Sequence, residues 1–230
     1  MGNFNSKFDL HTNDGLRKYM TSVFNKMFLA LCLTGLISFL CISNSEILAY
    51  MSSGISFILM LATFGIVVYI SARINKISAD NANALFWIYS ILIGASISPI
   101  LALYTGESIA NAFFSAAAFF GGMSFYGYVT KRDLTEVGSF MIVGIFAVII
   151  TSLVNSLFLH NSGLQIGLSV LSIIIFCGLT AYDIQNIKKF YHASLDDETL
   201  KKSGIIGALS LYLNFLNLFL AFLRILGNRK

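Results

Sequence analysis

Three polar side chains lie within long apolar runs or at the end of one, where a functional site inside a membrane would need them. Asp183 closes the run that begins near residue 164, and Asn214 and Asn217 lie in the middle of the last run. Carboxylate and amide oxygens are hard ligands that suit calcium, and an ionisable group inside a membrane is a functional candidate. Plainer interpretations stay open at this stage. Asp183 could be a solvated residue at the membrane boundary, and the two asparagines could form hydrogen bonds between helices.

The sequence contains no set of side chains that matches a known kind of intramembrane active site. The three histidines, His11, His160 and His192, lie in polar segments, so no span offers the base that an intramembrane serine protease needs. No lysine of the retinal-binding kind lies between 204 and 226. The acidic run 196–198 lacks the spacing and the glycine of a calcium loop. We therefore expect no enzyme, no resident metal and no cofactor beyond transiently bound Ca²⁺.

The elements that must position these residues are predicted to be membrane-spanning helices. The chain is 57% apolar and only 11% charged, whereas soluble domains carry about 25% charged residues. This composition excludes a water-soluble enzyme, a disordered chain and a nucleic-acid module. Runs of about 20 apolar residues, enough to cross a bilayer core of about 30 Å, lie near 22–42, 54–73, 84–104, 108–129, 136–158, 164–183 and 204–226.

The predicted fold is an all-α membrane protein, a seven-transmembrane-helix bundle. Residues 1–21 form a polar N-terminal segment, 22–226 a single transmembrane domain, and 227–230 a polar tail. The fourth span is rich in small residues, and its pairs Ala117–Gly121 and Ala118–Gly122 are interpreted as a face for close helix packing.

Lys and Arg residues are distributed unevenly along the chain. Twelve of the fifteen lie in the N-terminal segment and the second, fourth and sixth links or at the adjoining ends of the spans, and none lies in the first, third or fifth link. Because cytoplasmic links carry the excess of Lys and Arg, the N-terminus is predicted to be cytoplasmic. The exception is the C-terminal end, where seven crossings would carry Arg224, Arg229 and Lys230 to the far side. We favour seven crossings over a re-entrant last segment.

Three stretches of sequence resemble one known family. They are GLTAYDIQNIK at 178–188, GALSLYLNFLNLF at 207–219 with LRILG at 223–227, and YGYVTKRDLT at 126–135. The first two resemble the signature of the Bax inhibitor family, the transmembrane Bax inhibitor motif proteins, and the third is similar to bacterial members. The resemblance implies a seven-helix bundle with the last helix near its centre. It also implies a pH-sensitive calcium leak, and in eukaryotes the suppression of cell death.

The resemblance also implies which residues act. The family's pH sensor is a pair of aspartates, of which the first corresponds to Asp183 and the second to position 214, where this chain has Asn214. An arginine late in the second helix, which can engage the first aspartate in the family, corresponds by position to Arg73. Supporting polar residues are Asn217, Tyr182, Thr180 and Arg224. Without a second carboxylate, Asp183 is expected to titrate alone and to bind a cation more weakly than a pair would.

The expected function is therefore a pH-influenced calcium or other cation leak channel, with altered pH sensing because of Asn214. The alternative is a non-conducting scaffold or modulator that binds other membrane proteins, in protease regulation, quality control or stress suppression. A proton-coupled transporter would need a substrate cavity that the sequence does not indicate. The expected partners are the lipid bilayer and cations, with no nucleic acid. Similarity to bacterial members and the lack of an organellar signal favour the inner membrane of a bacterium.

Overall fold

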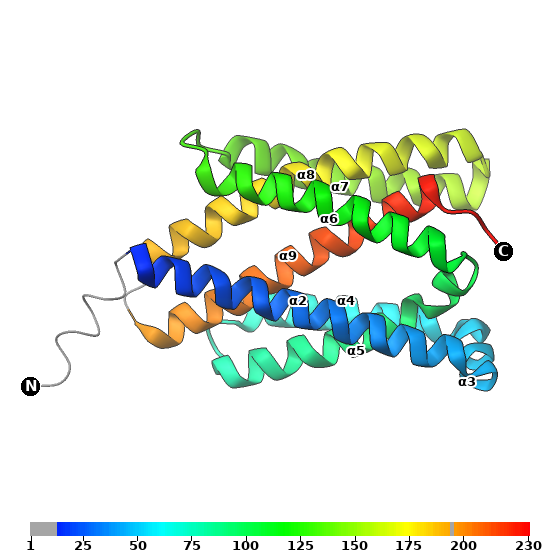
Figure 1. Ribbon diagram of the computed structural model, residues 1–230, viewed down its shortest axis with the longest axis horizontal. Helices are drawn as coiled ribbons and strands as arrows, with labels where there is room; N and C mark the ends of the chain where they lie inside the picture. The colour runs from blue at the N-terminus through cyan, green and yellow to red at the C-terminus, as the bar shows by residue number, and fades with distance from the viewer. Residues whose placement is uncertain (1–12, 194–195) are drawn as a thin grey trace, which may run out of the picture. The chain divides into compact units, whose positions relative to one another are not determined.

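The computed structural model describes residues 13–193 and 196–230, which are almost entirely helical (Figure 1). Residues 1–12 of the predicted polar N-terminal segment, His11 among them, lie outside the described residues. The helices are α2 (Asn13–Ser43), α3 (Ser45–Tyr50), α4 (Ser56–Arg73), α5 (Ala79–Ala102), α6 (Gly106–Val129), α7 (Thr135–Val154), α8 (Ser162–Ala193) and α9 (Asp197–Leu226). Short π-helical segments, Met51–Ile55 and Asn155–Leu159, join α3 to α4 and extend α7.

Seven helical stretches in the described part of the chain are long and apolar enough to cross a membrane. The predicted all-α class and all seven predicted spans are therefore confirmed. Polar side chains in the links cap the first turn of the helices that follow. Asn44, Ser78 and Thr105 each accept a hydrogen bond from a backbone N–H in the first turn of α3, α5 and α6, respectively.

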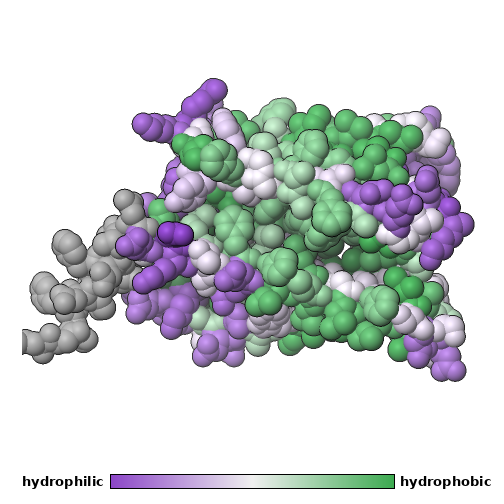
Figure 2. All heavy atoms as spheres, in the orientation of Figure 1, coloured by the Kyte–Doolittle hydropathy of each residue, from purple (hydrophilic) through white to green (hydrophobic). Residues whose placement is uncertain are grey.

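The sides of these helices carry large apolar residues. Figure 2 shows hydrophobic residues along the helices and hydrophilic residues gathered toward helix ends. Phe64, Phe114, Phe140 and Phe158 are each at least 70% exposed. A water-soluble protein rarely exposes so much apolar surface, so these side chains are suited to lipid.

The sixth span differs from its prediction at one end. The apolar run was expected to end at Asp183, but α8 continues to Ala193. Beyond Asp183 the helix is amphipathic, and Ile184, Ile187 and Tyr191 are all buried. This burial stabilises ten further residues as helix although their mean hydropathy falls, so Asp183 lies inside a helix and not at its end.

The chain divides into two compact units. The first takes the described residues up to Leu103 together with Ile187–Tyr212, and the second comprises Tyr104–Asn186 and Leu213–Lys230. The predicted single transmembrane domain, 22–226, stays a prediction. Most of the apolar window of α9 is buried.

In the first unit, hydroxyl groups join α2, α5 and the first half of α9. The Thr34 hydroxyl lies 2.9 Å from the backbone oxygen of Ser90 and 2.7 Å from the Tyr212 hydroxyl. The Ser38 hydroxyl donates to the backbone oxygen of Gly94 over 2.7 Å. Small residues and hydroxyls that bond across helices are how membrane helices associate without a hydrophobic driving force.

In the second unit, α6 packs through different small residues from those predicted. Apart from the adjoining residues and backbone of α6 itself, no atom of the described residues lies within 4 Å of a Cβ built at Gly121 or Gly122, so the predicted packing face is wrong for these two glycines. The buried small residues of α6 are Ser108, Ala112, Ala116, Ser124 and Gly127. The rotation of α6 about its axis decides which small residues face a neighbour, and composition alone does not reveal that rotation.

Candidate functional site

The candidate site is built around Asp183 on α8 and Asn214 on α9, both in the second unit. The Asn214 side-chain amide donates a hydrogen bond from Nδ2 to Asp183 Oδ2 over 2.8 Å. Asn214 is only 5% exposed, and Asp183 is half-buried. The carboxyl group is therefore held against the last helix, which contradicts the plainer interpretation of a residue simply solvated at the membrane boundary.

Two glycines bring neighbouring helices close to α8 beside Asp183. At Gly127 of α6, a Cβ would lie 2.8 Å from the Cα of Ala181. At Gly138 of α7, a Cβ would overlap the ring of Tyr182, 2.6 Å from its Cδ1 atom. Because each space is filled by backbone or by an aromatic ring, only glycine fits. These contacts fix the position and rotation of α8 at the residues that precede Asp183.

Gln185 is a positioning residue that sequence reasoning did not single out. Its Oε1 accepts a hydrogen bond from the backbone N–H of Leu134 over 2.9 Å, and its Nε2 donates to the backbone oxygen of Arg132 over 2.7 Å. The side chain is 8% exposed. It thus fastens the link between α6 and α7 to α8, two residues beyond Asp183. The sequence carried one indication of this role, namely an amide side chain within the family motif at 178–188.

The supporting polar residues fall in different places. Thr180 is fully buried, and its hydroxyl donates to the backbone oxygen of Phe176 in its own helix. Asn217 donates to the backbone oxygen of Leu213 over 2.8 Å, so this amide bonds within α9, whereas Asn214 reaches α8. Arg224 lies in the last turn of α9 and is exposed.

Arg73 is the last residue of α4, in the first unit, where its side chain is exposed. The expected engagement of Arg73 with Asp183 stays a prediction. Within residues 13–193 and 196–230, no three His, Cys, Asp or Glu side chains gather closely enough to hold a metal ion. A cation at Asp183 would meet one formal negative charge and neutral oxygens, a set that suits weak and reversible binding.

Comparisons with known proteins agree over nearly the whole chain. Residues 16–230 match the family model described as inhibitor of apoptosis-promoting Bax1. The chain is 44% identical to an uncharacterized protein of Rickettsia prowazekii, over 98% of this chain and 94% of that protein. It is 38% identical to the inner membrane protein YbhL of Escherichia coli, over 94% of each chain.

These matches add to the seven apolar helices and to the family motifs around Asp183 and Asn214. The relative in Escherichia coli is an inner membrane protein of nearly the same extent, and the helices described above have the length and composition to span that membrane. The chain is accordingly an integral protein of the inner membrane, and it belongs to the Bax inhibitor family.

Proposed function

We propose that this protein is a leak pathway for calcium or related cations, in which Asp183 is the charged contact and Asn214 holds it in place. The observation that supports the proposal is the 2.8 Å hydrogen bond between these two side chains inside membrane-spanning helices. A carboxylate within a membrane is costly unless it is paired or hydrated. The presence of this carboxylate is explained if its charge takes part in cation passage.

In this proposal each of the two side chains has a distinct role. Asn214 donates to Oδ2 of Asp183, so one carboxylate oxygen is occupied and oriented. The other oxygen can accept water or contact a passing cation. Protonation of Asp183 removes the only formal charge of the pair, so flux is expected to depend on pH. Arg73 is proposed to compete with the cation for this carboxylate.

The test is calcium flux into proteoliposomes that contain the purified full chain, measured over a series of pH values. The wild type should pass calcium with a rate that changes with pH, and Asp183→Asn should remove that pH dependence. The matched control is Asp196→Asn, the same chemical change at a fully solvent-exposed aspartate before α9. It should leave the profile unchanged, because asparagine also caps helices well.

A second variant tests the amide itself. Asn214→Asp restores two facing carboxylates, which cannot both ionise cheaply and so titrate as a coupled unit. This variant should have a stronger pH dependence than the wild type. An unchanged profile would show that the contact between residues 183 and 214 takes no part in gating.

Absence of calcium flux from the wild type at every pH would refute the leak. The alternative function, binding to other membrane proteins without conduction, would then be examined by crosslinking in cells and by following the stability of the captured partner after deletion of the gene.

A further inference from the structure

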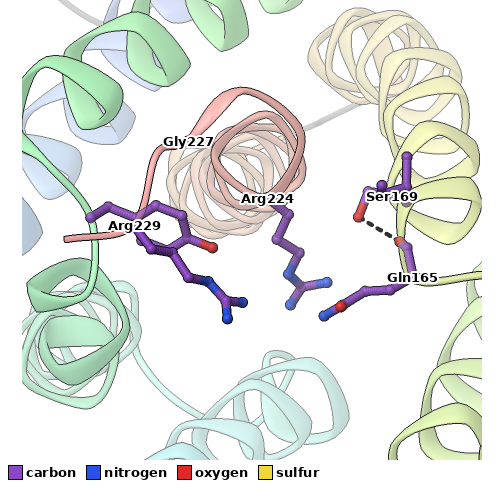
Figure 3. Close-up of a pocket in the computed structure, with 7 residues that line it drawn as sticks. Gln165, Ser169, Arg224, Gly227 and Arg229 are labelled. Carbon is purple, nitrogen blue, oxygen red and sulfur yellow. Dashed lines mark hydrogen bonds between the residues drawn. The ribbon is translucent and has the colours of Figure 1, made fainter. Parts of the chain in front are cut away.

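The proposed cation leak does not account for the cluster of cations at the C-terminal end. Seven crossings place Arg224, Arg229 and Lys230 on the side opposite the other twelve cations. Both arginines line a cavity of about 60 Å³ whose other walls include Tyr104, Gln165, Ser169 and Gly227 (Figure 3). One water needs roughly 10–15 Å³ of such space, so the cavity has room for a small polyatomic ion.

The segment that carries Arg229 is fixed to the second unit by its backbone. The Thr105 N–H donates to the oxygen of Asn228 over 3.2 Å, and the Asn228 N–H donates to the Ser108 hydroxyl over 2.9 Å. Tyr104 pairs with Arg229 in a short antiparallel bridge. The Arg229 guanidinium lies 6.0 Å from the centre of the Tyr104 ring, within the range of a cation–π contact. Arg229 is therefore positioned before any ligand arrives.

Hydrogen-bond donors converge on the cavity from two helices. Figure 3 shows the Arg224 and Gln165 side chains pointing toward each other, with the Arg229 guanidinium on the same side of α9. Gln165 also lies in the first turn of α8, which begins at Ser162, where the helix dipole is positive. Among residues 13–193 and 196–230, no carboxylate oxygen lies within 4.0 Å of either guanidinium. The cavity thus concentrates positive charge without an internal counterion.

The Ser169 hydroxyl contributes in a different way. It is buried and donates to the backbone oxygen of Gln165 over 2.9 Å, so its proton is used within α8 and the hydroxyl is not one of the cavity's donors. The donors left for a ligand are two planar guanidinium groups and one amide. Guanidinium forks match the oxygen spacing of phosphate groups and form charge-assisted hydrogen bonds with them.

We infer that this cavity binds a phosphate oxyanion at the membrane face opposite the N-terminus. Two sources supply that chemistry there: the headgroup of an anionic phospholipid and free inorganic phosphate. The cavity lies where α8 begins and α9 ends, at the depth of lipid headgroups for helices that span the bilayer. The site is separate from Asp183, so it stands or falls independently of the cation leak.

The test titrates the purified full chain, in a neutral detergent, with inorganic phosphate, with short-chain phosphatidylglycerol or with short-chain phosphatidylcholine. Binding is measured by native mass spectrometry and phosphorus NMR. Phosphatidylglycerol, phosphate or both should bind with 1:1 stoichiometry, and the double variant Arg224→Gln/Arg229→Gln should bind at least about tenfold more weakly, because it removes the charge-assisted bonds. Binding of phosphatidylglycerol alone would identify a lipid headgroup, and binding of phosphate would identify a free oxyanion.

Two further variants keep the test decisive. Gln165→Leu removes a donor at an exposed position without changing the charge, and it should weaken binding by about threefold. The control Arg17→Gln/Lys18→Gln removes the same two charges from exposed positions on α2, and it should bind as the wild type does. The inference is overturned if neither anion binds the wild type, if phosphatidylcholine binds equally well, or if the α2 control loses as much affinity as the Arg224/Arg229 variant.

Discussion

The approach of α6 to α8 at Gly127 can be tested by adding one methyl group. A Cβ at this position would lie 2.8 Å from the Cα of Ala181 and 2.9 Å from its carbonyl carbon, and nearer still to its carbonyl oxygen. All three are backbone atoms, so no change of rotamer relieves the overlap. In Gly127→Ala the two helices must therefore move apart, at a point two residues before Asp183.

The expected loss of stability follows from this overlap. Inserting a methyl group into a packed interior costs about 1–3 kcal/mol, and for a chain of this size each kcal/mol lowers Tm by about 2–4 °C. Gly127→Ala should thus lower Tm by about 2–12 °C. Gly121→Ala makes the same change in the same helix, but no atom of the described residues outside the adjoining part of α6 lies within 4 Å of its Cβ. It should leave Tm unchanged or raise it, since alanine favours helix over glycine by up to ~1 kcal/mol.

Thermal unfolding of both variants in one detergent, followed by helical circular dichroism, measures the difference. Equal Tm values for Gly127→Ala and Gly121→Ala would refute the close approach of α6 and α8. A lower Tm for Gly121→Ala than for Gly127→Ala would mean that α6 is rotated about its axis, so that Gly121 and not Gly127 is the packed glycine.

Three further predictions concern hydrogen bonds away from Gly127. Gln185→Leu should lower the free energy of unfolding by about 1–3 kcal/mol, because a buried backbone N–H and a part-buried backbone oxygen lose their partner, and trypsin should then cut the link between α6 and α7 faster. Tyr212→Phe removes a buried hydroxyl 2.7 Å from Thr34 and should lower the free energy of unfolding by about 0.5–1.5 kcal/mol, measured by thermal unfolding. The Thr199 backbone N–H holds the pKa of Asp196 below its usual value, so this cap stabilises α9 above about pH 4 and is lost as pH falls through the lowered pKa. The protection factor of the Thr199 amide, which compares its exchange rate with the intrinsic rate at the same pH, should fall over that range in the wild type and should be low at all pH values in Asp196→Ala.

The number and approximate positions of the spans were predictable because a bilayer requires only a sufficient length of apolar sequence, which can be read from each stretch of the chain by itself. The end of α8 was missed because a different requirement applies there. Ile184, Ile187 and Tyr191 are spaced so that they fall on one helix face, and all three are buried. A window that averages hydropathy cannot detect such a face, whereas helical periodicity can.

The candidate site was predictable only in part. The family motifs indicated Asp183 and position 214, and the structure adds their hydrogen bond. Gln185 was missed because its partners are backbone groups of the link between α6 and α7. Every residue has such groups, so the sequence does not reveal which of them lie near a given side chain. Gly127 and Gly121 are the same residue type six positions apart in α6. Only the rotation of that helix makes one of them a contact.

The amide at position 214, where the family resemblance implies a carboxylate, decides what pH can do to this pair. Two carboxylates hold together at hydrogen-bond distance only while they share a proton. Asn214 brings its own N–H, and it donates to an oxygen of Asp183 that can accept whether the carboxyl group is ionised or protonated. The contact between α8 and α9 at this point is therefore independent of pH. Any effect of pH on flux must act through the charge that Asp183 presents to the cation, and not through separation of the two helices.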